Sequence, residues 1–393
     1  MNKQRLVEIN EGKTSFTLER DSETIYDSSV FYNPKMSINR DLALLHLYTI
    51  GNISKKRLTI LDPFAGSGIR SFRIINELPK EYVKKVIISD ISEKAIKNVK
   101  LNIERSFNDE RIVVHREDAF NIIAKQIFDK ENIDVIDLDP FGTPISFIEV
   151  AVRALVKNNG YLFLTATDHQ VLCGKERAAC LREYNSNTSN NYLCHEIALR
   201  ILLHNILVSS GRIGVNIKPI LSLQFEHFFR IHVRIEKGKK KANKQHKKLG
   251  FVYVCAPCSF FEIERIEESK NLEKCPICSK KLEKIGPLWL GHLGNKEEIE
   301  LLLNFLDKIE FNQNNKKKIH SMLSILKEEI CLPPMFYNLP YLFKKYKKNG
   351  VSPRDMIDRL EKRGYFSTRT IFDPQSIRTD APYYVVHNEI KKL

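Results

Sequence analysis

The sequence lacks any apolar run that approaches the length of a membrane-spanning helix, which needs about 20 mainly apolar residues. Its first residues, MNKQRLVEINEGK, are too polar for a signal peptide. We therefore expect a cytoplasmic protein with no membrane segment. Acidic residues are scarce relative to basic ones, 48 against 63, and the net charge is +15. Such an excess attracts polyanions such as nucleic acids, although a lysine-rich solvated surface would give the same balance.

Cysteine is too sparse and too unevenly placed for a disulfide framework. Four of the eight cysteines form two pairs, Cys255-Ala-Pro-Cys258 and Cys275-Pro-Ile-Cys278, with 16 residues between them. This is the spacing of a four-thiolate zinc site, in which each pair turns two sulfurs toward one point. Because four thiolates complete a tetrahedral shell, we expect one zinc ion with a structural role.

The remaining cysteines and several histidines follow no metal-binding pattern. Cys173 and Cys180 have no CxxC partner and are expected to be buried. His169, His195 and His204 lack the spacing of metal ligands. No second metal site is predicted from these residues.

From residue 57 onward, short apolar runs alternate with helical patterns. Such alternation predicts βαβ units and a parallel sheet covered by helices. Ser92, followed by Glu93, is the expected N-cap of one of these helices. The expected strand segments, some of which include the loop that follows, are 58–68, 86–90, 111–120, 133–138 and 160–168.

The sequence DVIDLDPFGTP, residues 134–144, predicts a strand that stops abruptly at an acid. Proline and glycine after Asp139 end the strand, and ligands bind at the carboxyl ends of strands in an open α/β sheet. The Asp139 carboxylate and the Pro140 carbonyl can each accept a hydrogen bond from a flat amino group, while Phe141 stacks on the base that carries it. We expect a pocket for the exocyclic amine of a nucleobase.

A glycine-bearing loop follows the first expected strand. Gly66 and Gly68 give only GxG, which is a poor match to a nicotinamide-binding fingerprint. Asp90 lies 22 residues after Gly68, about the distance at which an acid reaches ribose hydroxyls. With Asp62 and Asp118 after two other strands, the pattern is typical of a site that binds an adenosine compound. Because no pyrophosphate-binding loop is present in the pattern, S-adenosylmethionine fits best. The alternative is that these acids only cap strand ends.

The second half of the chain predicts a separate domain. Residues 211–238 alternate as antiparallel strands of a second domain do, and the lysine-rich segment 237–248 has no apolar periodicity, which indicates an exposed loop. Helices are expected over 295–347, and phosphate contacts around Lys344–Lys348 and Arg369.

A further helix is expected from Ser352, followed by strands at 365–374 and 381–387. A helix pair followed by a strand pair suggests a winged-helix-like nucleic-acid-binding element.

Several segments occur in the same order as in the tRNA guanine-26 N2-dimethyltransferases, and the chain resembles the compact archaeal form of that family. The resemblance implies a Rossmann-type α/β methyltransferase domain, placed at 1–225, and a smaller α+β C-terminal domain at 226–393 with the zinc module at 251–290. It also implies S-adenosylmethionine as methyl donor and tRNA as substrate; we expect a monomer. The matching segments are VFYNPKMSINRD, LDPFAGSGIR, DLDPFGTP, TDHQVLCG, the paired CxxC motifs, GPLWLGHLG and STRTIFDPQSIRTDAP.

Carried over by position, the resemblance implies roles for individual residues. Asp139 would be the catalytic acid, with Phe31 and Phe141 clasping the guanine. The family usually has a small or hydroxyl residue where His169 stands, so no role is carried over to it. The residues implied at the cofactor are Arg40, Arg70, Asp90, Asp118 and Ala119.

The expected reaction is mono- and dimethylation of the exocyclic N2 amine of guanine 26 in tRNA. Two alternatives remain. An amino methyltransferase acting on adenine or cytosine in DNA would use the same acid, proline and aromatic ring. A non-catalytic nucleic-acid-binding protein would use the zinc module and the basic C-terminal region, with the sheet as a scaffold.

Overall fold

The computed structural model describes residues 5–20, 30–129 and 132–393. The chain divides into two compact units, each built from three segments. Unit 1 comprises Met1–Thr165, His232–Lys237 and Glu297–Ser321, and unit 2 comprises Ala166–Ile231, Gly238–Lys296 and Met322–Leu393. These limits differ from the single boundary at 225/226 placed from the sequence. Within the described residues, no helix is both long and apolar enough to cross a membrane.

Unit 1 begins with an antiparallel hairpin of β1 (Arg5–Glu11) and β2 (Thr14–Arg20), in which Glu11 pairs with Thr14. Gly12 supplies the left-handed turn conformation, with φ of +61°.

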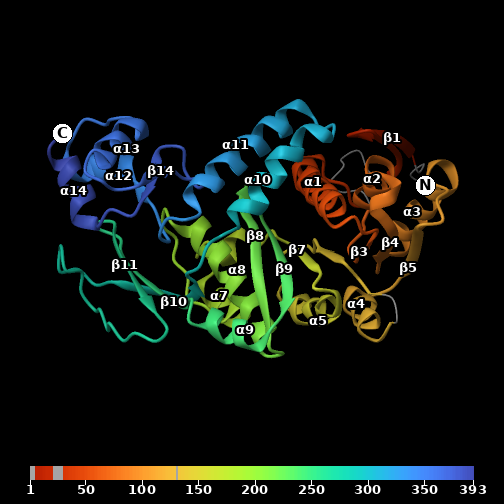
Figure 1. The fold of residues 1–393 in the computed structure, drawn as a ribbon, viewed down its shortest axis with the longest axis horizontal. Coiled ribbons are helices and arrows are strands. Elements are labelled where there is room, and N and C mark those ends of the chain that lie inside the picture. Colours follow the sequence, from red (N-terminus) through yellow and green to blue (C-terminus); the bar gives the residue numbers. More distant parts are fainter. Residues whose placement is uncertain (1–4, 21–29, 130–131) are drawn as a thin grey trace. The chain divides into compact units, whose positions relative to one another are not determined.

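Five parallel strands form the main sheet of unit 1 (Figure 1), in the order β5-β4-β3-β6-β7. All five lie within or overlap the segments predicted from the sequence. Their apolar runs suit strands covered on both faces, and β3 and β6 are buried along their whole length. The strands are β3 (Leu58–Asp62), β4 (Val83–Asp90), β5 (Ile112–Arg116), β6 (Val135–Leu138) and β7 (Tyr161–Ala166).

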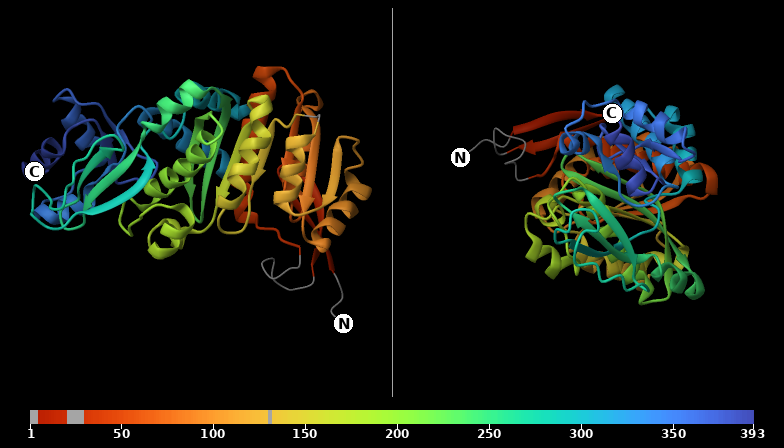
Figure 2. Two further views of the ribbon diagram at one scale, coloured as in Figure 1. Left: turned by 90° about the horizontal axis from the view of Figure 1, so that it is seen from below. Right: turned by 90° about the vertical axis from the view of Figure 1, so that its left-hand side faces the viewer.

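Helices cover both faces of these strands. Figure 1 shows α1 and α2 on one side of the strands and α4 and α5 on the other, where α4 and α5 lie side by side, as Figure 2 also shows. Ser92 caps α3 by accepting a hydrogen bond from the backbone N of Ala95, as predicted. The helices are α1 (Ser37–Ser54), α2 (Ile69–Glu77), α3 (Glu93–Ser106), α4 (Ala119–Phe128) and α5 (Ile145–Leu155), with 3-10 turns at Pro34–Met36, Lys80–Tyr82 and Val156–Asn158.

Two long strands, β8 (Val215–Phe225) and β9 (Phe228–Lys237), extend the main sheet to seven strands with the order β5-β4-β3-β6-β7-β9-β8. The sequence assigned them to a second domain, and β8 does belong to unit 2, but a sheet separate from the main one was the wrong expectation. Their alternating pattern identifies strands but carries no information about which neighbour they pair with.

The lysine-rich segment predicted to be an exposed loop is instead helix α9 (Lys239–His246). One small residue, Ala242, is buried, and the side chain of Gln245 exchanges hydrogen bonds with the backbone of Ile217 in β8. A single buried alanine gives no apolar periodicity, which is why the sequence did not indicate this helix.

Unit 2 contains three helices after β7 and a separate antiparallel sheet with the order β11-β10-β12. Helix α8 is almost entirely buried along its middle, as its mainly apolar sequence requires. The helices are α6 (His169–Leu172), α7 (Arg177–Tyr184) and α8 (Cys194–Gly211), and the strands are β10 (Leu249–Cys255), β11 (Phe260–Arg265) and β12 (Glu283–Trp289).

The C-terminal part of the chain contains the helices expected over 295–347: α10 (Lys296–Phe305), 3-10 turn Leu306–Lys308, α11 (Gln313–Glu329) and α12 (Leu339–Tyr346). The expected helix from Ser352 is α13 (Pro353–Glu361), which Ser352 and Asp355 close with a capping box.

A short sheet in the order β13-β15-β14 packs with α12 and α13, so a strand pair does follow a helix pair, but only its first strand lies in a predicted segment. The strand pair is β14 (Ser367–Arg369) with β15 (Ser376–Thr379), and β13 is Tyr337–Asn338. The strand expected at 381–387 is wrong, because Tyr383–Lys391 forms helix α14. Val386 and Ile390, one helical turn apart, are both buried in the core of this region, and that spacing outweighs the β-propensity of the segment.

Candidate active site

Strand β6 ends one residue before Asp139, so the DPFG motif stands at the strand's carboxyl end, as expected. Gly142 has φ of +75° and completes the turn away from the sheet. The Phe141 side chain is 77% exposed, and its ring meets that of Phe31 edge to face with 4.6 Å between centroids. The predicted acid and both predicted aromatic rings therefore lie in one region of unit 1.

Arg70, in the first turn of α2, contacts side chains at this strand end and in α1. Its buried guanidinium donates to Asp137 at 2.8 Å and forms an ion pair with Asp139. It also donates to the side chain of Asn39 at 3.2 Å. These carboxylates hold the pKa of Arg70 above its ordinary value despite its burial. The resemblance assigned Arg70 to the cofactor, and the structure brings it directly to the predicted catalytic acid.

The glycine loop between β3 and α2 is held in place by Asp90 and Phe31. The backbone N of Gly66 donates to one oxygen of Asp90 at 2.8 Å, and the other oxygen accepts from Ser92 at 2.8 Å. The backbone O of Phe31 accepts from Ser67 at 3.1 Å. A Cβ on Gly66 would lie 3.1 Å from that same oxygen, and Gly66 has φ of +52°, so glycine is required here.

Asp62, at the end of β3, carries an unsatisfied acceptor. One carboxylate oxygen accepts from the Ser71 hydroxyl at 2.9 Å, whereas the other, Oδ1, is buried without a hydrogen-bond partner. Burial raises the pKa of Asp62 to about 7, with Arg70 opposing and Asp137 adding to the effect. A buried carboxylate oxygen without a donor next to a glycine loop suits a ligand that brings an ammonium group.

Asp118 and Arg40 make local contacts of their own. Asp118 is the N-cap of α4, accepting from the backbone N of Phe120 at 2.9 Å, and buried Ala119 begins the helix. Arg40 forms a two-pronged pair with Glu11 at 2.6 and 2.5 Å. Glu11 also accepts from the Tyr32 hydroxyl at 3.0 Å. In the structure, Arg40 thus fastens the N-terminal hairpin to α1.

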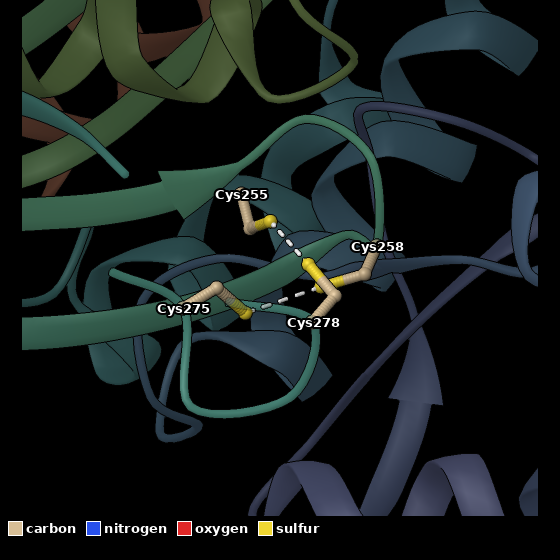
Figure 3. Close-up of side chains that lie close together, drawn as sticks. All are labelled: Cys255, Cys258, Cys275 and Cys278. Carbon is tan, nitrogen blue, oxygen red and sulfur yellow. Dashed lines mark hydrogen bonds between the residues drawn. The ribbon is translucent and has the colours of Figure 1, made fainter. Parts of the chain in front are cut away.

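Four cysteines of unit 2 converge in a second region, which Figure 3 shows in close-up. Their sulfur atoms all lie within 4.8 Å of one another, with 3.4 Å between Cys255 and Cys278 and between Cys258 and Cys275. Cys255 ends β10, and the backbone O of Cys258 accepts from Lys345 at 3.1 Å and from Tyr383 at 3.2 Å. Four thiolates that converge on one point complete a tetrahedral shell, so this donor set fits a zinc ion.

The chain matches the family model described as N2,N2-dimethylguanosine tRNA methyltransferase over residues 12–391. The chain belongs to this family. It is 34% identical to the tRNA (guanine(26)-N(2))-dimethyltransferase of Pyrococcus abyssi, over 98% of both chains, and 32% identical to that of Methanobrevibacter smithii, over 100% of this chain and 99% of the other. The solved complex of Trm1 from Pyrococcus horikoshii with S-adenosyl-L-methionine superimposes with a TM-score of 0.83 at 30% identity, covering 98% of this chain and 99% of that one.

The family resemblance and the α/β methyltransferase fold expected from the motifs are thus confirmed. The sequence did not indicate two residues that accept hydrogen bonds from Arg70, namely Asp137 and Asn39. Asp137 could have been noticed as an acid inside an otherwise apolar strand, since a buried acid requires a partner. Asn39 carries no such signal, because its role depends on where α1 lies next to α2.

Proposed function

We propose that the chain transfers methyl groups to the N2 amine of guanine 26 in tRNA and does so twice, giving N2,N2-dimethylguanosine. Family membership over nearly the whole chain supports this activity. The observation that carries the mechanism is the DPFG turn, with Asp139 anchored by buried Arg70 and with Phe31 and Phe141 beside it.

S-adenosylmethionine, the proposed methyl donor, supplies an electrophilic methyl group when bound. The glycine loop at Gly66 and Gly68 would let it approach the backbone, Asp90 would hold its ribose, and Asp118 and Ala119 would lie at its adenine. The unpartnered oxygen of Asp62 would accept from its ammonium group. Arg40 is the least supported of the proposed cofactor residues, because Glu11 occupies its guanidinium.

Asp139 and Pro140 would activate the guanine amine. Its lone pair is delocalised into the ring, which makes N2 a poor nucleophile. Hydrogen bonds from its two N–H groups to the Asp139 carboxylate and the Pro140 carbonyl would favour a pyramidal nitrogen and free the lone pair for in-line attack. Arg70 uses one oxygen of Asp139, and a carboxylate retains further acceptor positions for N2. Asp139 would then take the proton.

Phe31 and Phe141 would hold the flipped guanine. A base that leaves its stack in folded tRNA loses stacking energy, which aromatic side chains can replace. With 4.6 Å between their centroids and 83° between their planes, the two rings now touch edge to face. A base stacked between two rings needs room for one stacking distance on each of its faces. The rings would therefore move apart to admit guanine, and the exposed Phe141 side chain can turn.

We further propose one structural zinc at Cys255, Cys258, Cys275 and Cys278, and tRNA phosphate contacts by exposed lysines near the end of α12. Lys344 and Lys347 are exposed, whereas Lys345 donates to the backbone of the cysteine loop. All residues of the proposed methyl-transfer site come from unit 1 of one chain, which is consistent with a monomeric enzyme.

The decisive experiment is nucleoside mass spectrometry of unmodified tRNA incubated with the protein and S-adenosylmethionine, with the modified position mapped. We expect N2-methyl- and N2,N2-dimethylguanosine at position 26. Methylated adenine or cytosine instead would favour the amino methyltransferase alternative, and no binding of S-adenosylmethionine in equilibrium dialysis would favour a non-catalytic binding protein. Asp139→Asn should lower the turnover by about 10² to 10⁴-fold while cofactor affinity is retained.

A further inference from the structure

A second group of metal-ligating side chains lies in unit 2, apart in sequence from the four cysteines. The ligand atoms of His169, Cys173 and His195 all lie within 4.8 Å of one another. We propose that these three residues form a second zinc site, with two imidazole nitrogens and one thiolate. The four-cysteine site does not use any of them, and neither does the proposed methyl transfer.

The chain brings the ligands together from two helices. His169 begins α6 and Cys173 follows its last residue, so the two are four positions apart on one face of a helical turn. The backbone N of Cys173 donates to the O of His169 at 2.8 Å, which closes that turn. His195 is the second residue of α8. The site would therefore clasp α6 to the start of α8.

The backbone around the ligands is fixed by contacts that do not involve the ligands' side chains. The Thr188 hydroxyl donates to the O of Leu172 at 2.7 Å, inside the protein. Gly174 has φ of +80°, and a Cβ there would lie 2.5 Å from the backbone of Ser189. Both contacts hold the end of α6 against the segment that leads into α8, so the ligand positions are set before a metal arrives.

Stacking fixes the orientation of the His169 ring, and one of the ring nitrogens has no hydrogen-bond partner. It stacks on buried Phe229 with 4.3 Å between centroids and 17° between planes. Its Nε2 is buried without a hydrogen-bond partner. An unsatisfied buried nitrogen is costly, and coordination would satisfy it. The His195 ring lies 5.9 Å away, inclined at 73° to that of His169.

The donor set decides which metal is expected. Imidazole and thiolate together favour zinc over magnesium or calcium, which take oxygen ligands. Around zinc, such ligand atoms stand about 3.4 to 3.8 Å apart, so small side-chain rotations would close the site. The Cys194 thiol interacts with that of Cys173 and is next to His195 in the chain, so a side-chain rotation would bring it within reach of the ion as a fourth ligand. Partly exposed His169 and His195 leave a path for the ion.

The test is a zinc count on the full-length chain, purified under reducing conditions, equilibrated with zinc chloride and freed of loosely bound metal by gel filtration. We expect two zinc ions per wild-type chain by elemental mass spectrometry. His169→Asn and His195→Asn should each bind one, and so should Cys255→Ser. The matched control is His227→Ala, an exposed histidine close enough to His169 to influence it electrostatically, which should still bind two.

A cobalt titration gives an optical readout, because thiolate coordination to cobalt produces a charge-transfer band. His169→Asn should lose the part of this band that comes from the second site. One zinc ion in the wild type, lost in Cys255→Ser and retained in both histidine variants, would overturn the second site and leave the four-cysteine site intact. A Cys173–Cys194 disulfide, seen as two missing thiols in the denatured chain, with one zinc ion bound, would also overturn it.

Discussion

The guanidinium of Arg70 is ion-paired with the carboxylate of Asp139, the acid proposed to activate guanine N2, and it reaches Asp137 on strand β6 at 2.8 Å. The planar fork of arginine allows it to hold two carboxylates at once, which a lysine ammonium cannot do with the same geometry. We therefore expect Arg70 to act as a positioning residue for the proposed catalytic acid.

We expect Arg70→Lys to lower kcat by about 10²-fold, because a displacement of the acid by about 1 Å is enough for such a loss. Affinity for S-adenosylmethionine, measured by calorimetry, should change much less than kcat. Arg153→Lys is the matched control, an exposed arginine paired with Glu149 one turn away. A variant with normal kcat and strongly weakened cofactor binding would assign Arg70 to the cofactor alone.

The sequence predicts the strand and the turn of this site better than the contacts between its side chains. The strand at 135–138 and the turn after Asp139 follow from a β-branched run ending at proline and glycine, which are local signals. The Arg70–Asp139 pair joins residues 69 positions apart, and no local pattern encodes such a contact.

The same limit explains the other errors. β8 and β9 were recognised as strands, but their neighbours in the sheet depend on long-range packing. Helix α9 has one buried alanine among lysines, too little for a periodic signal. His169 and His195 are 26 positions apart and match no ligand spacing, so only the packing of α6 with α8 reveals that they meet.

Phe141 is the second residue whose role can be tested without disturbing the fold, since its side chain is 77% exposed. Stacking on a base contributes about 1 to 3 kcal/mol. Phe141→Leu should therefore lower kcat/KM for tRNA by about 5- to 100-fold, with an unchanged melting temperature. Phe128→Leu is the control, because Phe128 is 85% exposed at the end of α4 and outside the site. Equal losses in both variants would contradict a stacking role for Phe141.

Asp62 should make the stability of the cofactor-free chain depend on pH. Burial raises its pKa to about 7 in the folded state, against about 3.9 when unfolded. The folded chain therefore binds more protons between these values, and the free energy of unfolding falls as pH rises from about 4 to 7. The full effect is on the order of 4 kcal/mol.

Urea unfolding of wild type and Asp62→Asn at pH 5 and pH 7.5 measures this contribution. We expect the variant to gain stability relative to wild type at the higher pH. Asp358→Asn, which changes an exposed carboxylate on α13, should show no such trend. A difference between wild type and Asp62→Asn that is independent of pH would show that Asp62 is ionised throughout this range.

The last prediction concerns a buried ion cluster in unit 2 that links α8, α11 and β15. Arg378 donates to both oxygens of Glu196, at 3.0 and 2.8 Å, and to Glu329 at 2.8 Å, while Arg200 pairs with Glu196 at 2.8 Å. Burial alone would raise the pKa of Glu196, but Arg378 and Arg200 hold it at about 2. Arg378 thus pairs with two buried carboxylates and shares the neutralisation of Glu196 with Arg200.

Arg378→Met should lower the free energy of unfolding by about 3 to 5 kcal/mol, because it leaves buried charges without their partner. The comparison is Arg354→Met on the exposed face of α13, which should change it by less than about 0.5 kcal/mol. The double change Arg378→Met with Glu329→Gln should recover part of the loss, since it removes one of the stranded carboxylates. If the single Arg378→Met variant were as stable as Arg354→Met, the cluster would hold these elements together no better than an apolar contact does.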